Sequence, residues 1–132
     1  MVDSITELTP ADAGCIAVSG SHGGLCAARF ALATRPLLSI FNDAGRGKDA
    51  AGVAGLAFLQ DHGLAACTVA HSSARIGDAK STLHEGVISD KNALATGLGG
   101  EIGQTVLDLI QKISYKLTKY INIMNNVTVT TN

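Results

Sequence analysis

The sequence predicts an α/β fold, a three-layer Rossmann-like domain with a mostly parallel sheet and a long C-terminal helix. Three short apolar runs, 15–18, 37–41 and 64–70, alternate with two segments of helical character, 24–33 and 50–62. The runs lack polar alternation, which is typical of strands whose two faces are both covered. This strand–helix–strand–helix–strand order favours parallel strands joined by crossover helices, so we expect a sheet of about three to five strands.

Turn signals frame the first strand and the first helix. Thr9 and Pro10 predict a short capped turn of helix, because threonine is a good N-cap and proline fits the first helical position. The glycine-rich stretch 19–24 is expected to be the turn between strand 15–18 and the helix that follows. Pro36 ends that helix, since proline disfavours helical backbone in the residue before it.

The second helix is predicted over 50–62 from the amphipathic spacing of its apolar residues. Asp49 is predicted to be its N-cap and Gly63 its left-handed C-terminal residue. The segments 42–49 and 71–81, which follow the second and third strands, are predicted to be loops.

The pattern weakens after Thr82. Residues 86–89 fit either a short fourth strand or an extended loop, and 90–100 fits a helix interrupted by glycines. From Glu101 onward apolar residues recur at steps of three and four, which predicts a long helix. The asparagine pair 125–126 is expected to end it, with an edge strand or frayed tail at 127–131.

The composition changes near residue 110. The chain up to that point is rich in alanine and glycine and has no tyrosine, whereas lysine, tyrosine and asparagine become frequent afterwards. We therefore divide the chain into an α/β domain, 1–110, and a C-terminal helix extension and tail, 111–132. The extension could have a different origin, such as a fusion or a read-through. Alternatively, a surface helix is simply more polar than the core.

Charge is scarce, which limits the classes of partner. The chain is 46% hydrophobic and 16% charged, with a formal net charge of −1 and no block of basic residues. Nucleic-acid binding needs a basic face that displaces counterions, so nucleic acid is not expected as a partner. A surface this poor in charge favours a homo-oligomer. No membrane partner is expected, since the apolar runs fall far short of the ~20 residues that span a bilayer.

The three cysteines, Cys15, Cys26 and Cys67, do not have metal-ligand spacing. They are expected to be small buried hydrophobic residues, with a nucleophile or ligand as the alternative. The first residues lack the basic and apolar regions of a secretory signal, and free thiols suit a reducing compartment. We therefore expect a cytoplasmic location.

Polar residues follow each of the three strands. Right-handed crossovers would place these three loops at one edge of the sheet, beyond the carboxyl ends of the strands. In the first loop, the backbone of Gly23 and Gly24 and the hydroxyls of Ser19 and Ser21 could hold an anion or oxyanion at a helix N-terminus. His22 could transfer a proton. The alternative is a plain tight turn with helix capping.

The second and third loops add further candidates. Asn42 and Asp43 directly follow a strand, where Asp43 could orient a histidine. His71 is a second candidate for proton transfer, and Ser73 and Arg75 could bind substrate, since arginine can grip an anionic group with two hydrogen bonds. The alternatives are turn chemistry for the Asn–Asp pair and a surface loop in which Arg75 pairs with an acid.

These residues predict a small-molecule enzyme of hydrolase, lyase or isomerase type. Its substrate would be an anionic metabolite with a carboxylate or phosphate, bound at the carboxyl edge of the sheet. The catalytic residues would be His22, His71 and Asp43. A serine relay through Ser21 lacks the nucleophile-elbow pattern, and a metal site lacks any spaced motif, so no metal is expected and the cofactor stays open. The other hypotheses are a noncatalytic oligomeric ligand-binding or assembly module and a truncated remnant of an enzyme.

Overall fold

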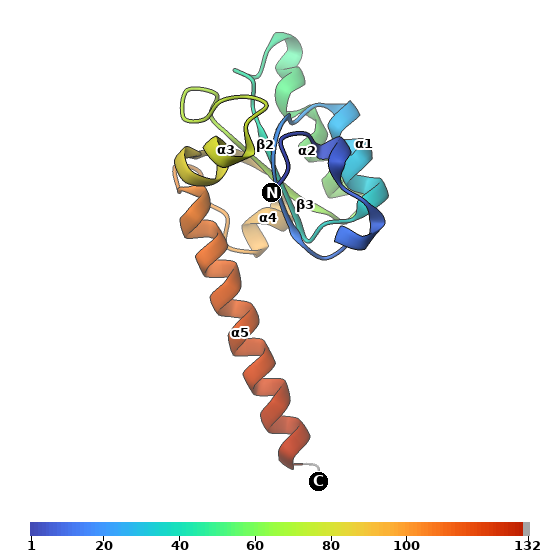
Figure 1. Ribbon diagram of the computed structural model, residues 1–132, viewed down its shortest axis with the longest axis vertical. Helices are drawn as coiled ribbons and strands as arrows, with labels where there is room; N and C mark the ends of the chain where they lie inside the picture. The colour runs from blue at the N-terminus through green and yellow to red at the C-terminus, as the bar shows by residue number, and fades with distance from the viewer. Residues whose placement is uncertain (131–132) are drawn as a thin grey trace.

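A four-stranded sheet forms the centre of the protein. The computed structural model describes the backbone of residues 1–130 and the side chains of residues 1–124. Strands β1 (Ile16–His22), β2 (Leu38–Asn42), β3 (Ala65–Val69) and β4 (Ile88–Lys91) lie side by side in that order (Figure 1). The first three strands are parallel and β4 is antiparallel to β3. The predicted mostly parallel α/β sheet is confirmed.

Helices cover both faces of the sheet, which makes the three predicted layers. Helices α1 (Leu25–Thr34) and α2 (Ala54–Asp61) cover one face, where Phe41 and Leu59 are fully buried. Helices α3 (Ala79–Glu85), α4 (Ala93–Gly97) and α5 (Val106–Thr130) lie over the other, where Ile40 and Leu109 are fully buried. Ile40 and Phe41 are neighbours in β2 and point to opposite faces, as the period of two in a strand requires.

The strand order explains why α1 and α2 share one face. Each right-handed crossover moves the chain one strand further in the same direction, so both connecting helices fall on the same side. The helices approach closely because Gly55 has no side chain: a Cβ there would lie 2.7 Å from the carbonyl oxygen of Gly24. The opposite layer is built entirely from residues after β3.

Strand β1 is longer than predicted. The stretch 19–22, expected to be a turn, continues the strand as far as His22. The N-terminal segment supplies the partners: Val2 forms a bridge with Ser19, and the Gly20 amide donates to the carbonyl of Asp3. Glycine-rich backbone can extend where a neighbouring segment satisfies its hydrogen bonds, and no local signal in 19–24 announces that neighbour.

The segment before α2 also differs from the prediction. Residues Lys48–Val53 form a 3-10 turn, and α2 begins only at Ala54. Asp49 does not cap α2, because it lies inside that turn in a left-handed conformation with φ of 56°. Gly63 follows α2 with φ of 77°, which confirms its predicted left-handed backbone. The turn at Pro10–Asp12, with Thr9 as N-cap, is also confirmed.

Short elements after β3 replace the predicted loop. The segment predicted to be a loop up to residue 81 contains the start of α3, whose N-cap Asp78 accepts a hydrogen bond from the Ser81 amide. Asn92 caps α4, and its buried side chain also accepts from the Ala66 amide and donates to two carbonyls of α2 and its C-terminal turn. One fully used amide therefore connects α4 to the sheet and to α2.

Helix α5 starts later and continues further than predicted. It begins at Val106 and its backbone is helical through Thr130, so residues 125–126 do not end it and 127–130 form no strand. Residue 131 lies outside the described part. Val106, Leu109 and Ile113 are buried against the sheet, and beyond them the helix projects away from the body (Figure 1). No helix in the described residues combines the length and apolar character that crossing a bilayer requires.

The cysteines divide into two groups. Cys67 in β3 is fully buried, and burial raises the pKa of its thiol to about 12. Cys15 and Cys26 are exposed, so the prediction that all three are buried is wrong for these two. Cys15 precedes β1 instead of lying within it, and Cys26 lies on the outer side of α1.

Shortening the chain after Lys116 is expected to leave the domain folded, with a Tm within about 2 °C of the full chain, because the described side chains that are removed, 117–124, are all exposed. Ending it at Thr105 should abolish folding, since Val106, Leu109 and Ile113 leave the core. Circular dichroism and a thermal melt of both truncations provide the measurement. Insoluble or unfolded protein after truncation at Lys116 would show that residues 117–132 are integral to the domain.

Candidate functional site

The carboxyl ends of β1, β2 and β3 meet at one edge of the sheet, called the rim here. His22 ends β1, Asp43 follows β2, and His71 follows β3 by two residues. His22 pairs in register with Asn42, and the Asp43 amide donates to the carbonyl of Val69. The rim therefore carries all three residues that we predicted to be catalytic.

Asp43 and His71 form a close pair. The Asp43 carboxylate accepts hydrogen bonds from the backbone amides of Gly45 at 2.8 Å and His71 at 3.0 Å. Its Oδ1 also lies 3.5 Å from Nδ1 of the His71 ring. A carboxylate held by two amides is fixed in position, and it can orient the imidazole and stabilise its protonated form.

The Asp43 carboxyl is held in its charged form. Its residue is only 5% exposed, and burial alone would raise its pKa. Hydrogen bonds from Gly45, Ser89 and His71, together with the charge of a protonated His71 ring, outweigh burial and lower that pKa below its ordinary value. The site therefore contains a fixed negative charge beneath an accessible imidazole, whose side chain is 63% exposed.

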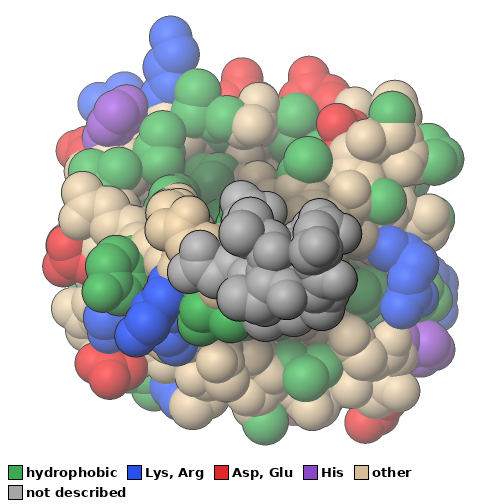
Figure 2. All heavy atoms as spheres, turned by 90° about the horizontal axis from the view of Figure 1, so that it is seen from below, with side chains coloured by type: hydrophobic (Ala, Val, Ile, Leu, Met, Phe, Trp, Pro, Cys, Tyr) green, Lys and Arg blue, Asp and Glu red, His purple; other side chains and the backbone are tan. Residues whose placement is uncertain are grey.

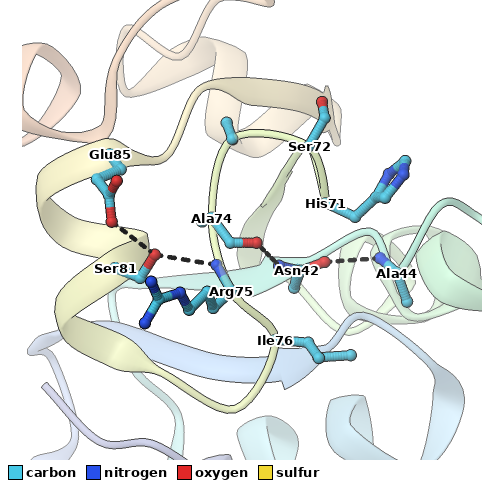
Figure 3. Close-up of a pocket in the computed structure, with 10 residues that line it drawn as sticks. Asn42, Ala44, His71, Ser72, Ala74, Arg75, Ile76, Ser81 and Glu85 are labelled. Atoms are coloured by element: carbon cyan, nitrogen blue, oxygen red, sulfur yellow. Dashed lines mark hydrogen bonds between the residues drawn. The ribbon is translucent and has the colours of Figure 1, made fainter.

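Asn42 holds two loops of the rim in place. It is fully buried, donates to the carbonyl of Ala74 at 3.0 Å and accepts from the amide of Ala44 at 2.8 Å (Figure 3). These bonds join the segment after β3 to the segment after β2. Asn42 was predicted to bind substrate. In the structure its side-chain amide is hydrogen-bonded to backbone groups, so we assign it a positioning role.

A hollow of about 510 Å³ lies beside the pair, over the segment 71–76 and helix α3. Its lining includes His71, Ser72 and Arg75 (Figure 3). Asp78 caps α3 and does not pair with Arg75, and among the described side chains no carboxylate lies within 4.0 Å of the Arg75 guanidinium. This exposed charge without a carboxylate partner can receive an anion.

Hydroxyls near the hollow are largely occupied by the protein. Ser73 donates to the carbonyl of Ala70 and accepts from the amide of Val87, which fastens its loop to the approach of β4. Ser81 accepts from the Arg75 amide and donates to the Glu85 carboxylate. Ser73, predicted to bind substrate, therefore positions the loop, whereas Ser72 is exposed on the wall of the hollow.

His22 lies in a neighbouring hollow. This second space, of about 480 Å³, is lined by His22, Arg46 and the start of α1, and Ala44 lines both hollows. Arg46 reaches over β3 to Asp90 in β4, with 2.6 Å between guanidinium and carboxylate. Asp43 and His71 therefore lie together beside the first hollow, whereas His22 lies in the second hollow, on the other side of Ala44.

The first loop does not form the predicted anion cradle. The Ser19 hydroxyl is fully buried and donates to the carbonyl of Ile40, and the Ser21 hydroxyl accepts from the Ile5 amide. The Gly23 amide donates to the carbonyl of Asn42. Three of the four predicted residues, Ser19, Ser21 and Gly23, therefore hydrogen-bond to the protein's own backbone.

Carbonyl oxygens also face this turn. A Cβ at Gly23 would lie 2.8 Å from the Gly52 oxygen, and one at Gly24 would lie 3.3 Å from the Ala51 oxygen. Both glycines permit this close approach of the segment before α2. The segment before α2 therefore packs closely against this turn through its backbone carbonyl groups.

The described residues assemble neither a serine relay nor a metal site. Ser21 lies in a separate hollow with Ile5, outside the one that contains His71, so the relay Ser21–His71–Asp43 is not assembled. Within residues 1–124, no group of three or more His, Cys, Asp or Glu side chains is placed to hold a metal ion.

Two features of the rim escaped the sequence analysis. Ser89 of β4 shares a hydrogen bond of 3.0 Å with the Thr68 hydroxyl and helps to lower the pKa of Asp43, and the Arg46–Asp90 ion pair joins the segment after β2 to β4. Both depend on β4 entering antiparallel, which brings its first residues to the rim. A short strand of uncertain pairing gives no sequence signal of this placement.

Comparison of the chain with protein-family models, with curated proteins and with solved structures finds no match, so the chemistry proposed below rests on the geometry of the rim.

Proposed function

We propose that the rim is the active site of a small-molecule enzyme that acts on a metabolite carrying a carboxylate or phosphate. The observation that carries the proposal is the Asp43–His71 pair at the edge of a hollow that also holds an arginine without a carboxylate partner. Ligands of α/β proteins bind beyond the carboxyl ends of the strands, which is where this hollow lies. Cytoplasmic action on such a metabolite is part of the same proposal.

Arg75 supplies the charge that selects an anion. Its guanidinium can donate two parallel hydrogen bonds to a carboxylate or phosphate. Its backbone is fixed by the bond from its amide to Ser81, so the side chain starts from a defined point on the wall. The exposed hydroxyl of Ser72 lies in the same hollow and can add a donor.

His71 transfers the proton, and Asp43 positions it. With Nδ1 directed to the carboxylate, Nε2 is the nitrogen that can take a proton from the substrate or give one to it. The buried negative charge of Asp43 stabilises the imidazolium that forms when His71 acts as a base. This division of roles suits proton abstraction, hydration or hydrolysis, the reactions of lyases, isomerases and hydrolases.

Arg75→Ala is expected to weaken anion binding at least tenfold, because it removes the charge that a carboxylate or phosphate would meet. Inorganic phosphate and malonate serve as probes, titrated by calorimetry or by chemical shifts of the 71–76 amides. Arg29→Ala, on the exposed side of α1, is the matched control and should bind as the parent does. Equal binding by the Arg75→Ala variant would exclude this hollow as the anion site.

Turnover distinguishes an enzyme from a binding module. A metabolite panel is first screened by thermal shift, and each stabilising compound is then followed for product. His71→Ala should keep binding and lose turnover by about 10²–10⁴-fold. A ligand that binds without product formation in the parent protein would favour the noncatalytic module, which is the second hypothesis for this chain.

A further inference from the structure

Helix α5 carries an apolar stripe beyond the body of the protein, which Figure 2 views from the end toward which the helix projects. The stripe consists of Leu117, Tyr120, Ile121 and Met124, whose exposed fractions lie between 46% and 61%. At 100° per residue these side chains continue the line of Val106, Leu109 and Ile113, which is buried against the sheet. One face of a single helix is therefore covered along its first turns and exposed along the next ones.

An exposed helix of this composition is not stable in water by itself. Isolated helices shorter than about 12–15 residues are marginal even when rich in alanine. The sequence after Ile113 contains no alanine and many Asn, Thr, Ile and Val residues, which have lower helix propensity. Packing of the stripe against another surface would provide the missing stabilisation.

The spacing of the stripe fits a second helix of the same kind. Ile110, Ile113, Leu117, Tyr120 and Met124 alternate steps of three and four, which is the a/d repeat of a left-handed two-helix contact. Ile113 is used by the core, so the exposed part of the repeat starts at Leu117. Tyr115 falls at the f position, on the side of the helix opposite the stripe.

The lysines identify the arrangement of the two helices. From residue 109 to the end of the sequence there are three lysines and no acidic residue. At 100° per residue Lys112, Lys116 and Lys119 all lie on one flank of the stripe, while Ser114, Thr118 and Ile121 lie toward the other.

We propose that the stripe pairs with the same stripe of a second copy of this chain, as a parallel dimer. In a parallel pair each g flank faces the partner's e flank, so the lysine flank meets an uncharged one. An antiparallel pair would set the two lysine flanks against each other. A helix that lies in a lipid surface is usually flanked by basic residues across its polar face, whereas here one flank has none.

The contact between the two stripes is small. Covering the exposed parts of these side chains in both copies would bury roughly 1,000 Å², near the lower limit for specific interfaces. A weak dimer is therefore expected, with dissociation in the micromolar range. The rims of the two copies are not part of the contact, so this proposal stands or falls independently of the enzymatic one.

The test measures self-association of the full chain by sedimentation equilibrium from about 1 to 500 μM. Tyr120→Asp should weaken the dimer at least tenfold, because a charge enters the seam. Tyr115→Asp is the matched control: the same substitution, five residues away on the f position, should leave association unchanged. Helix content is checked by circular dichroism, and Leu117→Asp with Thr118→Asp forms a second pair of the same design.

Several outcomes would overturn the proposal. The full chain could remain monomeric throughout this concentration range, or both tyrosine variants could change association equally. A monomer that co-sediments with vesicles of phosphatidylserine and phosphatidylcholine would show that the stripe binds lipid instead. Orientation is read from Leu117→Cys in a chain with Cys15→Ser and Cys26→Ser: a parallel pair forms a disulfide crosslink at position 117 under mild oxidation, and an antiparallel pair does not.

Discussion

Asp43→Ala is expected to lower the free energy of unfolding by about 3 kcal/mol, because two partly buried backbone amides lose a charged acceptor. The backbone amides of Gly45 and His71 both donate to this carboxylate, and alanine offers them nothing in return. The segment after β2 and the segment after β3 are then no longer joined through this side chain. Urea denaturation of both proteins, with unchanged slope, measures the loss.

Asp61→Ala is the matched control for this substitution. Asp61 is exposed in the last turn of α2, and its replacement should change stability by no more than about 0.5 kcal/mol. If Asp43→Ala were equally mild, the hydrogen bonds at the rim would contribute nothing measurable. The carboxylate would then be retained for chemistry alone.

The same carboxylate predicts a pH dependence of stability. The folded-state pKa of Asp43 lies below its ordinary value of 3.8, so the folded protein binds the proton less well than the unfolded chain does. Its contribution is fully present above the unfolded pKa and is lost as the pH falls through the folded one. Denaturation curves between about pH 2 and pH 7 should therefore show a smaller acid-side slope for Asp43→Ala than for the parent. Parallel slopes would refute the linkage.

Gly20→Ala is expected to lower the free energy of unfolding by about 3 kcal/mol or more. A Cβ on Gly20 in β1 would overlap the backbone nitrogen of Asp78 and the backbone of Gly77, which have no rotamer to change. The carbonyl of Gly20 also accepts from the Gly77 amide at 2.7 Å, so relief would require breaking that bond. Thermal unfolding and yield of soluble protein measure the effect.

Gly97→Ala provides the comparison. Gly97 ends α4 in ordinary backbone, and a Cβ added there would meet no atom within 4 Å, so alanine should be neutral or stabilising by up to about 1 kcal/mol. A large loss at Gly97 or a mild effect at Gly20 would contradict the packing described here. Comparing the stability of the two variants separates the cost of a clash between two backbones from the general effect of adding a methyl group.

Local signals were sufficient for the repeating part of the fold. The uniform apolar runs that became β2 and β3 predicted covered strands, and Pro10 and Gly63 predicted a helix start and a left-handed helix end. The edge that carries Asp43 and His71 followed from the predicted parallel strands and their right-handed crossovers, which place the loops after the strands on one side of the sheet. These features depend on neighbours close in sequence or on a general rule of handedness.

Contacts between distant segments were not predictable in this way. The extension of β1 through His22 depends on the N-terminal residues pairing beside it, and the burial of Ser19 depends on a carbonyl in β2. A serine between glycines looks the same whether its hydroxyl faces a ligand or a neighbouring strand. The direction of β4, which brings Ser89 to Asp43, is likewise decided by pairing.

By itself, then, the sequence determined the α/β class, the parallel strands and the carboxyl edge that carries His22, Asp43 and His71. Only the tertiary structure decided that Asp43 joins His71, that His22 lies beyond Ala44, and that the glycines after β1 face carbonyls. The physical reason is that hydrophobic periodicity records which face of an element is covered. It does not record which hydrogen-bond partner each polar group finds in the folded protein. Those partners decide which side chains at the rim stay available for chemistry.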